Sequence, residues 1–306
     1  MVWTADGYWA KAQSYVGRAF GTGDPTEQGV WAALGLELLL RAAICQTHPA
    51  LNAEPKEDNG VSLLVACGVP AGAAKTIPIK AVVARLAKIH PEQFTKRRSD
   101  FLETFTFKRN EEVHADTAAF AGYVAAQWLP EFADVVIATC EATRRPLTTL
   151  LDEARAKTLQ EHAGSLHARV KGLAVQAVTA AKRRFDALDE AERERLKTDG
   201  SRRAASARDR APAELGAKPC PACGADAVVL GRAMRVGEPR VDEADGNVVV
   251  ERWLVAEELK CFACELELHG IEAVLGAGTE PHWTAKVSMT LDEFLSHEAW
   301  DGYENM

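Results

Sequence analysis

The chain has 306 residues, of which 47% are hydrophobic and 26% charged, and its formal net charge is −8. These values are ordinary for a soluble globular protein and allow two domains. The acidity lies at the C-terminal end, where residues 215–306 carry 7 basic and 17 acidic side chains, whereas residues 151–214 carry 14 basic and 11 acidic ones. The overall balance argues against a simple basic nucleic-acid-binding protein.

The most apolar stretch of the chain, VWAALGLELLL, is interrupted by Glu37 and followed by Arg41. It falls short of the roughly 20 apolar residues that a membrane span needs. The first residues, MVWTADGYWAKAQ, lack a basic segment followed by an apolar run. We therefore expect a cytoplasmic protein with no membrane association.

Apolar residues recur every three or four positions through most of residues 1–145, which predicts a bundle of four or five helices. The stretches between them contain the Pro, Gly and Asn residues that end helices. The clearest helical patterns cover residues 9–20, 26–46, 79–90 and 118–143.

A helical extension is expected over residues 146–197, with a break near Gly164. The next segment, 198–217, is rich in small and charged residues and has no apolar period, so we expect a flexible linker there. These features predict a mainly α protein up to this point.

The apolar period changes to two near residue 218, as in half-buried strands. NVVVERWLVAEELKC and CELELHGIEAVL show this alternation, and we expect a small β domain over residues 218–275. The tail, 276–306, contains the sequence TLDE, in which Thr290 and Glu293 have the spacing of a capping box. A short final helix is therefore expected to begin there.

Two CxxC pairs lie in this β domain, at Cys220 with Cys223 and at Cys261 with Cys264. Four thiolates held in two tight turns form the tetrahedral sulfur cage that Zn²⁺ favours. The spacing therefore predicts a zinc ribbon with one structural Zn²⁺ per chain. A redox dithiol needs one pair beside a βαβ pattern, which these residues do not show.

Four cysteine ligands leave no open coordination position, so the expected zinc is structural and not catalytic. Many ribbons bind nucleic acid through a basic surface, but this one is acidic. We expect it to bind a protein partner or to mask a basic surface elsewhere in the same assembly. The histidines near it are expected to be ordinary surface or packing residues: His269, His282 and His297. The other cysteines are expected to be small buried hydrophobic residues: Cys45, Cys67 and Cys140.

The spacing RxxxxH occurs twice, from Arg85 to His90 and from Arg109 to His114. The first copy follows a helical period and needs no functional explanation. In the second copy, FKRNEEVHAD, Asn110 follows the arginine and is a suitable N-cap, with two glutamates in the expected first turn. A helix break at Asn110 would allow Arg109 and His114 to converge, since five residues of a straight helix place them about 140° apart.

RNEEVH resembles the RxxxxH motif, with a polar residue after the arginine, of HEPN domains, and GLELLLRAAI resembles their apolar second helix. The resemblance covers roughly residues 1–145 and implies a helical bundle that dimerises so that two motifs face each other. It also implies a metal-independent endoribonuclease, with catalytic roles for Arg109, Asn110 and His114. Related nucleases with appended domains occur in bacterial toxin and antiviral systems, which implies growth arrest or phage defence.

The residue types suit RNA cleavage by the 2′-hydroxyl. Histidine can give or take a proton near neutral pH. Arginine offers a permanent charge to the phosphate oxygens. Glu37, an acid within an apolar helix, is a candidate to orient Arg109 or else an edge residue. Four cations are candidate contacts for the RNA backbone, or else part of a solvated face: Lys96, Arg97, Arg98 and Lys108.

Two other functions stay open on this sequence. One is a non-catalytic HEPN-like dimerisation or adaptor protein, in which Arg109 and His114 belong to a solvated helix and the ribbon binds a partner. The other is a zinc-ribbon accessory protein of transcription.

Overall fold

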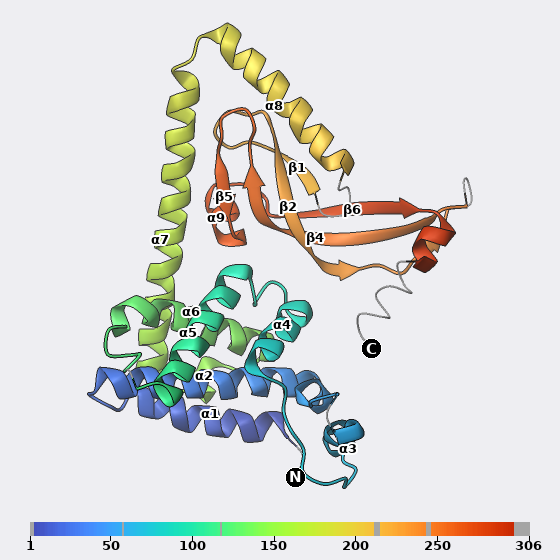
Figure 1. Ribbon diagram of the computed structural model, residues 1–306. Coiled ribbons are helices and arrows are strands. Elements are labelled where there is room, and N and C mark those ends of the chain that lie inside the picture. Colours follow the sequence, from blue (N-terminus) through green and yellow to red (C-terminus); the bar gives the residue numbers. More distant parts are fainter. Residues whose placement is uncertain (1–2, 57, 117, 211–214, 243–245, 297–306) are drawn as a thin grey trace. The chain divides into compact units, whose positions relative to one another are not determined.

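The structure is a computed structural model that describes residues 3–56, 58–116, 118–210, 215–242 and 246–296. The chain divides into two compact units, Met1–Ala168 and Arg169–Met306, which are described separately (Figure 1). Helix α7 contributes residues to both.

The first unit is helical, as the sequence predicts. Its helices are α1 (Ala5–Ala19), α2 (Pro25–Thr47), α3 (Val61–Ala66), α4 (Ile79–Ile89), α5 (Lys96–His114), α6 (Ala125–Thr143) and the first half of α7 (Glu153–Asp186). Short 3₁₀ turns occur at η1 (Pro49–Asn52), η2 (Asp58–Gly60) and η3 (Leu147–Thr149).

Helices α1 and α2 form an antiparallel pair along one side of this unit (Figure 1). Asp24 caps α2 by accepting a hydrogen bond of 2.7 Å from the Thr26 amide, and Pro25 occupies the first turn. The two helices approach closely at Gly35, where a Cβ would lie 2.7 Å from a methyl of Val16. Glycine is therefore required there by packing.

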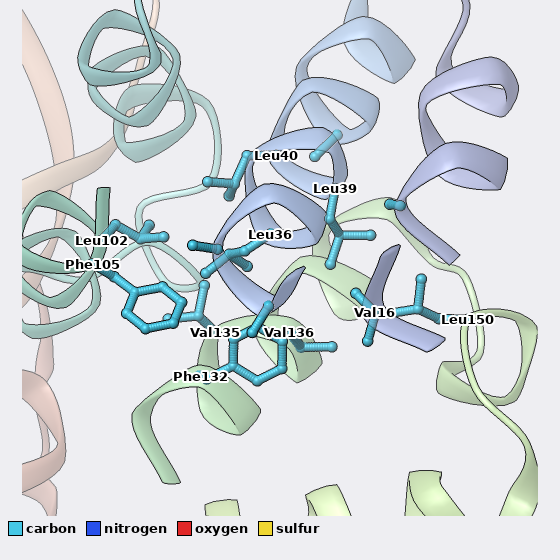
Figure 2. Packing of buried hydrophobic residues seen from close by; sticks show 14 of the residues in the cluster. Val16, Leu36, Leu39, Leu40, Leu102, Phe105, Phe132, Val135, Val136 and Leu150 are labelled. Atoms are coloured by element: carbon cyan, nitrogen blue, oxygen red, sulfur yellow. The ribbon is translucent and has the colours of Figure 1, made fainter. Parts of the chain in front are cut away.

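The core of the first unit lies where α2, α5 and α6 meet. Leucines of α2 point toward Leu102 and Phe105 of α5 and toward Phe132 and Val135 of α6 (Figure 2). Phe105 also packs against Phe120 and Trp128, with ring centroids 5.6 and 5.3 Å apart. This aromatic cluster fixes α5, the helix that carries the Arg109 to His114 motif.

Helix α2 has the length and apolar composition of a membrane span, contrary to our expectation that no stretch approaches one. Within the described structure, 67% of the apolar window of this helix is buried, as in the central helix of a bundle. Arg41, at 8% exposure, lies on it.

The second unit contains the C-terminal half of α7, helix α8 (Glu190–Arg210), helix α9 (Ile271–Gly276) and one antiparallel sheet. The strands are β1 (Leu215–Pro219), β2 (Asp226–Val236), β3 (Arg240–Val241), β4 (Val248–Lys260), β5 (Glu267–His269) and β6 (His282–Met289). Strand β4 is central: it pairs with β2 and β3 along one edge and with β5 and β6 along the other.

Helices cover the cysteine end of this sheet. Ala174, Ala181 and Phe185 of α7 are buried in the same cluster as Val229 and Leu259 of the sheet. Helix α8 contacts β1 and β2. At Gly200 of α8, a Cβ would lie 2.8 Å from Ala263 in the second CxxC turn, so this helix lies directly against the turn.

Two expectations about residues 146–217 are wrong. Helix α7 passes through Gly164 without a break. The expected linker, 198–217, is helical to Arg210 and becomes strand β1 from Leu215, while 211–214 lie outside the described residues. Helix α8 has no apolar period because it packs through small residues. Its buried residues are Gly200 and Ala204.

The expected boundaries of the β domain also change. Residues 271–276, in an expected strand, form α9, and the expected tail supplies strand β6, which pairs with β4 over eight residues. The capping box is confirmed, because the Glu293 amide donates to Thr290 Oγ1 at 3.2 Å and the Thr290 amide donates to Glu293 Oε2 at 2.8 Å.

Candidate functional site

The four cysteines of the two CxxC pairs come together in one cluster. All four Sγ atoms lie within 4.8 Å of one another, and the Cys220–Cys264 and Cys223–Cys261 pairs are each 3.5 Å apart. A tetrahedral zinc with Zn–S bonds of about 2.3 Å places its sulfurs about 3.8 Å apart. The cluster therefore has the size of a single four-sulfur metal site.

Each pair lies in a tight turn of matching conformation. The residue after the first pair, Gly224, has φ of +77°, and the residue after the second, Glu265, has φ of +59°. The Cys220 amide donates to the Ala225 carbonyl at 2.8 Å, and the Cys261 amide donates to the Leu266 carbonyl at 2.9 Å. These turns thus bring the two thiols of each pair to the same side.

The proton balance of this cluster favours a bound cation. Hydrogen bonds among the thiols lower the pKa of Cys220 and Cys261 and raise the pKa of Cys223 and Cys264. Four adjacent thiolates therefore coexist only when a cation offsets their charge. The geometry and chemistry of the cluster are compatible with one structural zinc.

Arg109 of the second RxxxxH copy points into the bundle. It forms an ion pair with Glu37 of α2, which is the contact that the sequence suggested. The same carboxylate accepts from Arg41 Nη2 at 2.9 Å. Glu37 therefore bridges two guanidinium groups, and its own side chain is 21% exposed.

Arg41 anchors this network inside the unit. Its Nη1 donates to Asn52 Oδ1 at 2.8 Å and to the carbonyl of Ile77 at 3.1 Å. Asn52 in turn donates to the Tyr8 hydroxyl at 3.1 Å, and burial raises the pKa of Tyr8. A guanidinium with partners on several sides costs less to bury than an unpaired one.

The expected helix break at Asn110 is wrong. Helix α5 runs continuously from Lys96 to His114, and Asn110 caps nothing. Phe101, Phe105 and Arg109 are spaced by four residues, so they form one inward stripe whose packing keeps the helix intact.

The continuous helix separates the motif residues within one chain. Asn110 and His114 are both exposed, and their spacing of four places them on one face together with Phe107, which is 65% exposed. Arg109 lies about 140° from His114 around the axis. Arginine and histidine of a single copy therefore do not form one site.

A groove with a volume of about 440 Å³ runs beside this outer face, between α4 and α5. Ile79, Val83, Phe107 and Asn110 are among the residues that line it. Most of its lining surface is apolar, and Lys80 and Glu103, which also line it, are paired at 3.0 Å. The exposed half of the motif thus adjoins a mainly apolar surface.

The expected RNA-backbone cations are engaged in ion pairs. Lys96 pairs with Asp100 and Lys108 with Glu111, at 2.9 and 3.1 Å. Arg97 pairs with Glu131 and Asp134, and Arg98 binds Asp134 through two hydrogen bonds of 2.7 and 2.8 Å. The two arginines hold α5 against α6. Because their guanidinium groups are paired there, they are not available to RNA, which differs from the expectation.

Asp134 was missed by the sequence analysis. It is 1% exposed and also contacts His167 Nε2 of α7 at 2.7 Å. Burial acting by itself would raise the pKa of this carboxyl, but hydrogen bonds and positive charges from Arg98 and Arg97 outweigh burial and hold the pKa well below its ordinary value. The clue in the sequence was the single acid inside FADVVIATC, downstream of KRR.

The first RxxxxH copy is structural, as expected. Val82 and Leu86 of α4 are buried, and Arg85 donates to the carbonyl of Leu51 rather than pointing freely outward. Burial lowers the pKa of His90. Its histidine and arginine therefore serve the packing of α4.

The remaining cysteines divide into two groups. Cys45 and Cys140 are buried as expected, and burial raises their pKa to about 11 and about 12, so both are poor nucleophiles. Cys67, expected to be buried, is exposed at the end of α3, a helix of only six residues.

The ribbon histidines are surface residues where the structure describes them. His269 is 3.7 Å from Glu258, and His282 Nδ1 is 3.0 Å from Glu280. His297 lies outside the described residues.

Comparisons with protein-family models, with curated proteins and with solved structures found no match for this chain.

Proposed function

We propose that the four-cysteine cluster binds one structural Zn²⁺ that holds the second unit together. The cluster carries this proposal because its four sulfurs fit a single tetrahedral ion and leave no position for a substrate. Metal analysis of freshly purified protein should find one zinc per chain. Protein without zinc, or with another metal in stoichiometric amount, would contradict it.

We propose further that the first unit is a cytoplasmic, metal-independent endoribonuclease of HEPN type that works as a homodimer. The observation that carries this proposal is the outer face of α5, where Asn110 and His114 are exposed together beside an apolar groove. Such a face offers proton-transfer chemistry next to a surface suited to a second copy. Growth arrest or phage defence is the role that such an activity would serve.

The dimer supplies what one chain lacks. Cleavage by the 2′-hydroxyl needs a base for that hydroxyl and an acid for the leaving 5′-oxygen, and one His114 does not serve both at once. Two copies of α5 across a two-fold axis would provide both groups, with Asn110 donating to the phosphate. The proposed cation for the phosphorane is Arg109 of the opposite copy, reached from its 20% exposed edge.

Cleavage of a labelled RNA in EDTA tests the nuclease directly. Wild type should cut, and His114→Ala should lose activity by at least about 100-fold, the usual contribution of a general acid or base. A matched control is His162→Ala, since His162 is a histidine of α7 outside the motif. Equal cutting by wild type and His114→Ala would rule out the assigned role of His114.

Mixing subunits tests the dimer. Adding His114→Ala chains to wild type should lower the activity more than dilution does, because a mixed dimer keeps only one His114 and lacks either the acid or the base. A fully active monomer in sedimentation would contradict the facing arrangement.

A non-catalytic dimerisation or adaptor protein is the second candidate, and one observation favours it. Arg109 already has a carboxylate partner in Glu37 and points away from His114. In that case the α5 face would bind a partner, and the acidic ribbon would recruit another. Absence of RNA cleavage together with a stable dimer that Phe107→Ser disrupts would support this function.

A further inference from the structure

The C-terminal half of α7 carries an exposed basic face within an acidic protein. From Arg169 to Phe185 the chain has five basic and no acidic side chains, although its net charge is −8. Three of these cations define the α7 basic face: Arg169, Arg183 and Arg184. All three are exposed.

The helix is fixed by its opposite side. Ala174, Ala181 and Phe185 are 3%, 0% and 4% exposed and belong to the core of the second unit. The packing of α7 against the sheet therefore directs the other side of the helix to solvent. Because those buried residues lie about 120–180° around the axis from Arg169 and Arg183, these cations are held outward.

The basic face differs from the other cation clusters of the chain. Arg97, Arg98 and Arg109 form ion pairs in the first unit, and on α8 Arg195 and Arg202 pair with Glu192 and Asp199. Among the described residues, by contrast, no member of the α7 basic face has an ion pair or a side-chain hydrogen bond. These charges are therefore available to an external anion.

The spacing of the face suits an extended polyanion. Arg169, Gln176 and Arg183 are seven residues apart and lie within about 40° of one another around the helix. They cover about 21 Å, which is the length of about six stacked nucleotides. The exposed residues between them include Gly172, Leu173, Thr179 and Ala180, none of which is acidic.

We propose that the α7 basic face binds the phosphate backbone of single-stranded RNA. This inference rests on the proposed function for its choice of polyanion, and it places RNA binding in the second unit rather than at Lys96–Arg98. The face would retain the substrate while the first unit cuts it. Contacts of this kind are independent of nucleotide sequence and sensitive to salt.

Fluorescence anisotropy with a labelled 20-nucleotide single-stranded RNA tests the proposal on the full-length chain. His114→Ala serves as the background, so that no cleavage disturbs the measurement. Replacing the three cations of the face with Gln should weaken Kd by at least about tenfold near 0.1 M salt. It should also reduce the slope of log K against log salt by about 2, at about 0.7 per phosphate contact.

A matched control removes three exposed but paired cations: Lys96, Arg195 and Arg202. Their replacement with Gln changes net charge equally and should leave Kd within about twofold. Circular dichroism should show both variants folded, since Gln is a good helix former.

The outcomes separate the possible errors. Equal RNA binding by wild type and the α7 variant would overturn the proposal that the α7 basic face binds RNA, even if the protein proves to be a nuclease. Binding of poly-glutamate but not of RNA would also overturn it and would indicate an acidic protein partner. RNA binding through this face without any cleavage by the wild-type chain would keep the surface and reject the nuclease.

Discussion

The two motifs found in the sequence behave oppositely in the fold. In the cysteine cluster, residues three apart in each pair lie in a tight turn and their side chains converge. In RNEEVH, residues five apart lie on a continuous helix, and their side chains diverge by about 140°. A short motif therefore predicts a site only where the conformation between its residues is also fixed.

The difference lies in what determines the local backbone. Gly224 and the hydrogen bonds of the turn impose the bend around the first cysteine pair regardless of the rest of the chain. At Asn110 the local preference for a helix start competes with the packing of Phe101 and Phe105, and packing prevails. Local preference decides turns, whereas tertiary contacts decide where a long helix begins.

The largest expected effect comes from a substitution in the cysteine cluster, whose side chains converge. Cys261→Ser should release the metal and unfold the sheet, because metal binding in closed cysteine sites contributes on the order of 10 kcal/mol. Zinc content and the fluorescence of Trp253 and Trp283, both in the second unit, would report the change.

The control for this variant is Cys67→Ser, which alters an exposed cysteine outside the cluster. It should keep both zinc and fluorescence. A Cys261→Ser protein with an unchanged sheet and an unchanged melting temperature would show that the cluster does not stabilise the fold.

The cysteine cluster and most of the bundle were predictable because each signal lies within a short stretch of sequence. The signal is the CxxC turn in the cluster and the apolar period in the helices. Residues 26–46 and 79–90 have apolar periods that packing later satisfies, and they correspond to α2 and α4. The ion pairs of the bundle were less predictable, because Glu37 and Arg109 are distant in sequence and meet only through the fold. The pairing of Asp134 with Arg97 and Arg98 depends in the same way on how α5 lies against α6.

Asp134→Asn should produce the next largest effect. The change removes a buried charge and leaves Arg97 and Arg98 without their shared partner, which costs about 3–5 kcal/mol when one member of a buried pair is lost. Urea unfolding followed by far-ultraviolet circular dichroism measures it. Asp100→Asn, at an exposed pair with Lys96, is the matched control and should cost less than about 1 kcal/mol.

The same carboxyl predicts an acid limit to the stability of the first unit. The folded pKa of Asp134 lies below its ordinary value of 3.8, so its contribution is fully present above about pH 5 and is lost as the pH falls below 4. Unfolding free energies of wild type should therefore drop between pH 5 and pH 2. The Asp134→Asn variant should show a shallower decrease, and identical slopes would contradict the assignment.

In RNEEVH, where the side chains of Arg109 and His114 diverge, substitutions are expected to have smaller effects on stability. The two effects should also differ in size. Arg109→Ala removes an inward ion pair with Glu37 and should cost about 1–3 kcal/mol. His114→Ala alters an exposed side chain at the end of α5 and should change stability by less than about 0.5 kcal/mol. Equal destabilisation in thermal unfolding would show that the two side chains share one environment, contrary to the helix geometry.

The smallest expected effect concerns the position that follows each cysteine pair, Gly224 in the first turn and Glu265 in the second. Gly224 and Glu265 both adopt positive φ, a conformation that costs a residue with a side chain about 1 kcal/mol or more. Glu265→Gly should therefore raise the unfolding free energy of the zinc-loaded chain by about 1 kcal/mol, while Gly224→Ala should lower it similarly. A Cβ at Gly224 has no atom within 4 Å, so that cost would be purely conformational. If both variants matched wild type in chelator-induced unfolding, the bound metal rather than the backbone would set the shape of the turns.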